Sequence, residues 1–105
     1  MKYAIYQINL DRDQASRYYF LSFERMKREA GGRIPVEIYD KVYEGEIESS
    51  EPEIEWTLER IFEEFNISRA KHPNFRGHSL SVSDIVELDG VRWFCDSFGW
   101  KRILQ

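Results

Sequence analysis

The chain has 105 residues, of which 42% are apolar and 15% aromatic, and this is enough for a single domain over residues 1–105 with its own core. The net charge of −4, without a basic stripe, makes binding to duplex DNA unlikely. A single cysteine, no signal peptide and no apolar run of membrane-spanning length predict a cytoplasmic protein without a membrane anchor.

The N-terminal third predicts a strand followed by a helix. Residues 2–10 are apolar on both faces, as in a strand that is covered on both sides. Asp13 is the expected N-cap of the helix, and Gly31–Gly32 is its expected end, since glycine accepts the left-handed backbone of a C-terminal cap. Apolar residues recur at helical spacing between these limits, at Tyr19, Phe23, Met26 and Ala30.

The middle third predicts a second strand and a second helix. A short turn or half-helix follows Pro35, and the chain then continues as a strand through Val42 and Tyr43 to Ile47. Ser50 and Glu53 have the spacing of a capping box, and Asn66 is a natural stop. The helix starts near Glu51 or near Thr57, and the pattern does not decide between them. Its apolar stripe comprises Ile54, Leu58, Ile61, Phe62 and Phe65.

Negative charge is concentrated in the same region. Residues 37–64 carry a net charge of −9, whereas residues 1–36 carry +3 and residues 65–105 carry +2. A solvated surface is the simplest interpretation of such a run. The alternative is a surface that imitates the charge of DNA.

The last third predicts a hairpin and a short strand. Asp89–Gly90 is a two-residue turn of the kind that suits strand twist, between residues 84–88 and 91–96. Gly99 interrupts the chain before a final strand at residues 100–104. The whole order of elements predicts an α+β fold with a largely antiparallel sheet, two helices and a C-terminal hairpin.

Few residues suggest catalysis. Cys95 can be combined on paper with His78 and an aspartate, but its position within a strand is typical of a small core side chain. His72 and His78 match no standard zinc spacing, and the chain lacks a glycine-rich phosphate loop. We therefore predict no metal, no cofactor and no catalytic residue.

Two polar stretches remain, "FRGHSLSVSD" and "DSFGW", which we name the first signature segment (residues 75–84) and the second signature segment (residues 96–100). The alternation of Ser79, Ser81 and Ser83 is strand-like, and Asp84 is expected to accept bonds from nearby backbone N–H groups. Gly77 is expected to supply an unusual backbone angle.

Two residues of the first signature segment receive opposite predictions. Arg76 is expected to pair with Asp84 or Asp96 and thereby to join the two segments. His78 is expected to be exposed and dispensable for folding. In the alternative interpretation, Arg76, His78 and Trp100 are exposed together and form a binding edge.

These stretches, with "YAIYQI", "VYEGEI" and "FNI", resemble the YodL-like domain family over nearly the whole chain. The family occurs on phages and conjugative elements, so the resemblance implies a mobile-element setting. It implies signature residues rather than catalytic ones. Those residues, with Trp100 added as a possible part of a binding surface, are Phe75, Arg76, Gly77, His78, Ser79, Ser81, Asp84, Asp96, Ser97, Phe98, Gly99 and Trp100.

Three functions are compatible with the sequence. The first is a non-enzymatic accessory module of a mobile element that contacts a protein partner. The second is a module associated with nucleic acid, or an acidic DNA mimic. The third is an enzyme that uses His78 with Asp84 and Asp96. The sequence identifies neither the partner nor the oligomeric state.

Overall fold

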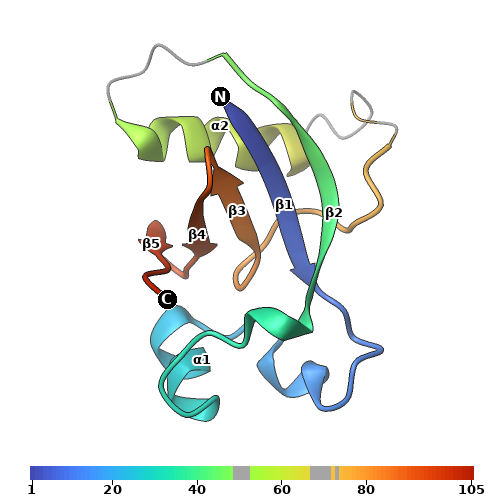
Figure 1. Ribbon diagram of the computed structural model, residues 1–105, viewed down its shortest axis with the longest axis vertical. Coiled ribbons are helices and arrows are strands. Elements are labelled where there is room, and N and C mark those ends of the chain that lie inside the picture. Colours follow the sequence, from blue (N-terminus) through green and yellow to red (C-terminus); the bar gives the residue numbers. More distant parts are fainter. Residues whose placement is uncertain (49–52, 67–71, 73) are drawn as a thin grey trace.

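A five-stranded antiparallel sheet organises the chain in the computed structural model, which describes residues 1–48, 53–66, 72 and 74–105 (Figure 1). The strand order is β2-β1-β3-β4-β5. The strands are β1 (Lys2–Ile8), β2 (Tyr39–Glu46), β3 (Ile85–Leu88), β4 (Val91–Cys95) and β5 (Trp100–Arg102). Two α-helices, α1 (Phe23–Glu29) and α2 (Ile54–Asn66), pack against the sheet, and the predicted α+β class is confirmed. None of the described helices is long and apolar enough to span a membrane.

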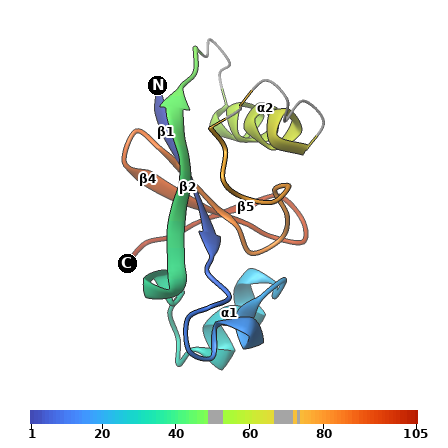
Figure 2. The same ribbon diagram turned by 90° about the vertical axis from the view of Figure 1, so that its right-hand side faces the viewer.

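The sheet carries an apolar cluster on each face. Strand β1 lies between β2 and β3 and contributes side chains to both clusters. Tyr3 and Ile5 belong to the cluster beneath α2, while Tyr6 and Ile8 contribute to the cluster on the α1 side. Figure 2 shows α2 and α1 at opposite ends of the molecule. The apolar character of both faces of "KYAIYQI" follows from this position.

Helix α2 packs its predicted stripe against the sheet, with Ile54 and Phe62 partly buried. Leu58, Ile61 and Phe65 are fully buried against Val86 and other residues of the sheet. The helix ends at Asn66, as predicted, and begins at Ile54. The capping box that the sequence predicts between Ser50 and Glu53 cannot be compared, because Ser50 lies outside the described residues.

The first helix is shorter than predicted, and Asp13 is not its N-cap. Residues Ala15–Tyr18 form a separate 3₁₀ helix, and α1 begins at Phe23 with Ser22 as its cap. Tertiary contacts cause the break: the backbone N–H of Phe20, a residue with φ of 64°, donates to Ser83 Oγ. The predicted end is confirmed, since Gly31 and Gly32 both have positive φ.

The C-terminal hairpin is confirmed. Asp89 and Gly90 have φ values of 45° and 86°, as the tight turn between β3 and β4 requires. A short 3₁₀ helix, Val36–Ile38, precedes β2. The alternating serines of the first signature segment are not a strand, because regular pairing of β3 starts only at Ile85.

Candidate functional site

The first signature segment is fastened to β1 by the side chain of Gln7, which is only 3% exposed. Gln7 Nε2 donates to the carbonyl of His78 (2.9 Å) and to Asp84 Oδ2 (3.0 Å). Gln7 Oε1 accepts from the backbone N–H of His78 (3.1 Å). One buried amide therefore holds two points of the segment.

Asp84 is the buried end of this network. Its Oδ2 also accepts from the backbone N–H of Ser81 (2.9 Å), as the sequence predicted, while its Oδ1 has no partner among the described residues. Burial raises the pKa of Asp84 to about 7, although the bonds from Ser81 and Gln7 act in the opposite direction. The carboxyl group is thus held inside the protein by an amide and a backbone N–H, both of which are neutral donors.

Gly77 is required for a reason other than the predicted backbone angle. Its φ is not positive, but a Cβ atom at this position would lie 2.0 Å from Gln7 Oε1. Any side chain here would displace the amide that bonds His78 and Asp84. The glycine therefore permits the close approach of β1 to the first signature segment.

His78 is half-buried, so the prediction that it is exposed was wrong. Its Nδ1 lies 2.7 Å from the carbonyl oxygen of Ser79, and its Nε2 lies 3.2 Å from the hydroxyl of Tyr19. The tautomer with its proton on Nδ1 donates to the carbonyl of Ser79 and accepts from the hydroxyl of Tyr19. The imidazole therefore has structural partners at both nitrogens.

Arg76 is exposed, and its predicted pairing with Asp84 or Asp96 was also wrong. Asp84 is fully buried and bonds to Gln7 and Ser81 instead. The backbone N–H of Arg76 donates to the carbonyl of Val42 in β2 (3.3 Å), so the segment lies along that strand. Two open hollows flank the Arg76 side chain, and charged residues of both signs line them: Asp11, Asp40, Lys41 and Glu44.

Backbone bonds join the first signature segment to Cys95, the residue directly before the second signature segment. The N–H of Ser83 donates to the carbonyl of Cys95 (2.9 Å), and the N–H of Cys95 donates to the carbonyl of Asp84 (2.8 Å). Ser83 has φ of 83°, and its carbonyl accepts from the Tyr39 hydroxyl (2.6 Å). This junction extends the β3–β4 ladder and fixes where the second segment starts.

The second signature segment is a rigid turn with an exposed aromatic tip. Asp96 Oδ1 accepts from the N–H groups of Phe23 (3.0 Å) and Ser97 (2.8 Å), and Asp96 N–H donates to the carbonyl of Gly99 (3.0 Å). Gly99 has φ of +69°, which glycine adopts readily. The side chain of Phe98 is 90% exposed.

Trp100 does not share this exposure, which corrects the binding edge expected from the sequence. It is 6% exposed, and its Nε1 donates to Glu59 Oε1 on α2 (2.8 Å). Its ring also meets Phe62 edge to face. Trp100 therefore secures β5 to α2.

Cys95 is a core residue, as predicted. It is buried, and burial, together with the nearby charge of Asp84, raises its pKa to about 12. A thiol in this state is a poor nucleophile. The structure therefore gives no support to the combination of Cys95 with His78.

The residues of the predicted enzyme each serve another contact. Asp96 bonds the start of α1, Asp84 bonds Gln7, and His78 bonds Tyr19 and Ser79. Over the part of the chain that the structure describes, no group of three or more His, Cys, Asp or Glu side chains is arranged to hold a metal ion.

Sequence reasoning missed Gln7, Tyr19 and Tyr39. Gln7 had a detectable signal, because it is a polar residue within a strand that is otherwise apolar on both faces. A buried amide needs several partners, so such a residue indicates a tertiary hydrogen-bond network. Nothing in the local sequence identifies those partners.

The fold and the two signature segments define a small α+β domain in which a polar loop is locked onto a central strand through one glutamine. A family model, the YodL-like domain, matches residues 2–105, and the chain belongs to that family. No curated protein and no solved structure matches the chain.

Proposed function

We propose that the protein is a non-enzymatic interaction module that binds another protein in the cytoplasm, as an accessory of a mobile genetic element. The exposed ring of Phe98 is the observation that supports this proposal most directly. The setting in a phage or a conjugative element is the one that the family resemblance implies.

Phe98 has the properties of an interface anchor. A large apolar ring in water is unfavourable, and its burial against a partner recovers that free energy. The turn beneath it is held by the bonds of Asp96 to Phe23 and Gly99. Because the turn is already ordered, binding costs little conformational entropy.

The polar residues of the two segments support a binding role over a catalytic one. Asp84, His78 and Asp96 all bond other parts of the fold. Their hydrogen bonds shape the surface, and Phe98 is the large apolar residue that the second segment presents to solvent.

Affinity capture from a lysate of cells that carry the element tests this function. The immobilised wild-type protein should enrich a specific partner, and Phe98→Ser should lose it. Leu10→Ser is the matched control, since Leu10 is an exposed aliphatic residue that lines a hollow beside Arg76. Equal capture by all three proteins, or by none of them, would refute the proposal.

A second candidate function is an acidic DNA mimic or a module associated with the DNA machinery of the element. The observation that favours it is a ridge of exposed carboxylates on α2, at Glu55, Glu59 and Glu63, each about one helical turn from the next. The hollows beside Arg76 contain Asp40 and Glu44, so they do not form a basic face.

Competition with duplex DNA separates the two candidates. If the acidic ridge is a mimic, random-sequence duplex should displace the captured partner, and replacing the three glutamates by glutamine should abolish capture. If the partner binds at Phe98, neither treatment should release it.

A further inference from the structure

Strand β5 forms one edge of the sheet, and its outer side is unpaired in the described residues. The phase of the β4–β5 ladder shows which groups face outward. The N–H of Ile103 donates to the carbonyl of Arg92, and the N–H of Asp96 donates to the carbonyl of Gly99. Bonded pairs alternate along an antiparallel ladder, so Lys101 bonds inward to Phe94. The N–H and C=O groups of Trp100 and Arg102 therefore point away from the sheet.

The opposite edge differs, because the first signature segment lies beside β2. The N–H of Arg76 donates to the carbonyl of Val42 near the middle of that strand. Figure 1 shows the chain that follows residue 73 passing beside β2, whereas β5 lies at the far side of the sheet. Strand β2 is thus bonded at one point of its outer edge, whereas the outer edge of β5 carries no such bond in the described residues.

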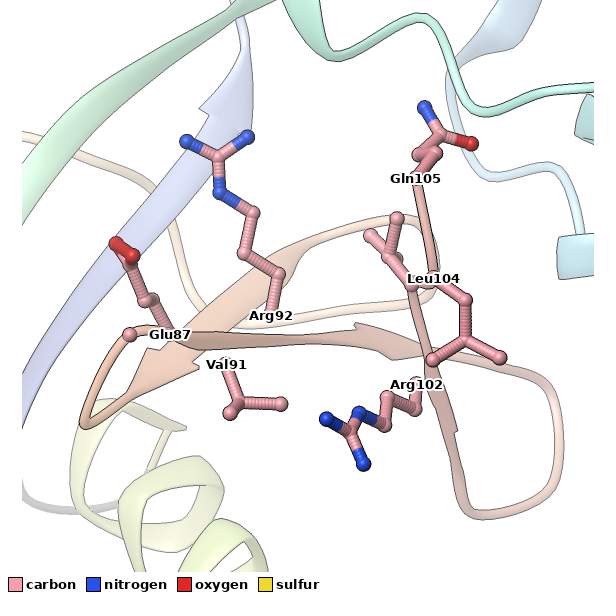
Figure 3. Close-up of a pocket in the computed structure, with 8 residues that line it drawn as sticks. Glu87, Val91, Arg92, Arg102, Leu104 and Gln105 are labelled. Atoms are coloured by element: carbon pink, nitrogen blue, oxygen red, sulfur yellow. The ribbon is translucent and has the colours of Figure 1, made fainter.

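Exposed apolar side chains bracket this edge. Phe98 precedes β5 and is 90% exposed, and Leu104 follows it and is 82% exposed. Lys101 and Arg102 lie between them and are also exposed. An open hollow at the end of the strand is lined by Val91, Arg102 and Leu104, among others (Figure 3).

A small anion is a poor match for this hollow. Figure 3 shows the guanidinium groups of Arg92 and Arg102 pointing in different directions, so they do not converge on one point. Arg92 instead lies over the ring of Tyr6, at 5.2 Å from its centroid. The available groups suit an extended chain, with backbone bonds at the strand and apolar contacts at both of its ends.

We propose that β5 pairs with an extended segment of a partner protein, one that carries acidic side chains opposite Lys101 and Arg102 and apolar side chains for Phe98 and Leu104. The positive charges of Lys101 and Arg102 favour an acidic partner segment over a second copy of β5. In a β5–β5 pair between two copies, the lysines and arginines would oppose one another, which is unfavourable. Strand β2 of a second copy is acidic, but the N–H of Arg76 bonds its edge at the Val42 carbonyl. The inference rests on the proposed function, because it names the partner's binding element.

Selection from a displayed library of random short peptides tests the proposal, and it does not require that the partner be identified first. Wild-type protein should enrich peptides in which adjacent acidic residues are flanked on both sides by apolar ones. Amide hydrogen exchange followed by NMR supplies the structural readout. In the free protein the amides of Trp100 and Arg102 should exchange faster than that of Lys101. A selected synthetic peptide should protect both of them.

Substitutions at Arg102 separate the contribution of its backbone N–H to peptide binding from that of its side chain. Arg102→Pro removes an outward N–H while the inward bonds of Lys101 remain, and proline is tolerated on the solvent side of an edge strand. It should weaken peptide binding by at least about tenfold, since the unmatched peptide carbonyl adds to the lost bond. Arg102→Thr keeps the N–H and should cost less. If Arg102→Pro does not fold, the wild-type exchange pattern decides.

Three results would overturn the inference: no peptide enriched by wild-type protein, enriched peptides that protect other amides, or a dimer whose β5 amides become protected as concentration rises. Affinity capture from the lysate distinguishes failure here from failure of the proposed function. A partner that Arg102→Pro still captures leaves the function in place and removes only the β5 site. If a peptide binds β5 but no protein is captured from the lysate, the β5 site stands and the proposed function fails.

Discussion

Replacing Asp84 by asparagine should change how stability depends on pH. The carboxyl is fully buried, and its pKa rises from the ordinary value of 3.8 to about 7. Asparagine cannot ionise, but its side-chain oxygen can still accept from Gln7 Nε2 and from the backbone N–H of Ser81. Its amide nitrogen takes the place of Oδ1, which has no partner among the described residues.

The direction in which stability changes with pH follows from the protons that the folded and unfolded states bind. Between about pH 4 and pH 7 the folded protein keeps the Asp84 proton that the unfolded chain has released, so stability falls as the pH rises through this range. The two pKa values differ by about three, at about 1.4 kcal/mol for each, which gives a loss of about 4 kcal/mol. Asp84→Asn should lack this loss but should carry a cost of about 1–3 kcal/mol for the unpaired amide.

The two stability curves should therefore cross. At pH 4 the wild-type protein should be the more stable, and at pH 8 Asp84→Asn should be equal to it or more stable. Urea unfolding followed by tryptophan fluorescence at a series of pH values measures both curves. Asp13→Asn, at an exposed site, controls for the change in charge. Parallel curves for wild type and Asp84→Asn would refute the raised pKa and the burial argument behind it.

Three further predictions concern single side chains. Cys95, whose pKa burial raises to about 12, should react slowly with a thiol reagent in the native state and rapidly in denaturant; fast native labelling would contradict its place in the core. Gly77→Ala should lower the free energy of unfolding in urea by about 3 kcal/mol, because the new methyl group overpacks against Gln7 and breaks its bonds. In combination with Gln7→Ser, part of this loss should be recovered. Strictly additive losses would argue against the contact between residues 77 and 7. In thermal melts, Arg76→Ala should change stability by no more than about 0.5 kcal/mol and His78→Ala should lose about 1–2 kcal/mol; the opposite order would return both residues to the roles expected from the sequence.

Local signals in the sequence predicted the sheet well. The turn at Asp89–Gly90 and the two-sided apolar pattern of β1 depend on neighbouring residues, and both are confirmed. The stripe of α2 is likewise a local pattern. Such features can be read from a sequence because their physical cause lies within a few residues of them.

The parts that sequence reasoning missed depend on contacts between distant residues. Gln7 and Asp84 are 77 positions apart, and their bond decides the roles of Gly77 and His78. The shortened α1 has a similar cause, since Ser83 takes the N–H of Phe20. The charge of Arg76 suggests an ion pair, whereas its backbone makes the contact that matters.

The same backbone contact explains how the fold manages its two edges. An exposed strand of eight residues such as β2 invites association with other chains. The bond from Arg76 to Val42 limits this, and it depends on the path that Gln7 and Gly77 impose on the segment. The first signature segment thus blocks the longer edge at one point near its middle. Strand β5 has only three residues and exposed cations, so it can remain open with less risk of self-association. The edge of β5 is open and is flanked by Phe98, and its cations disfavour pairing with a second copy of the same strand. It is therefore suited to a partner of opposite charge.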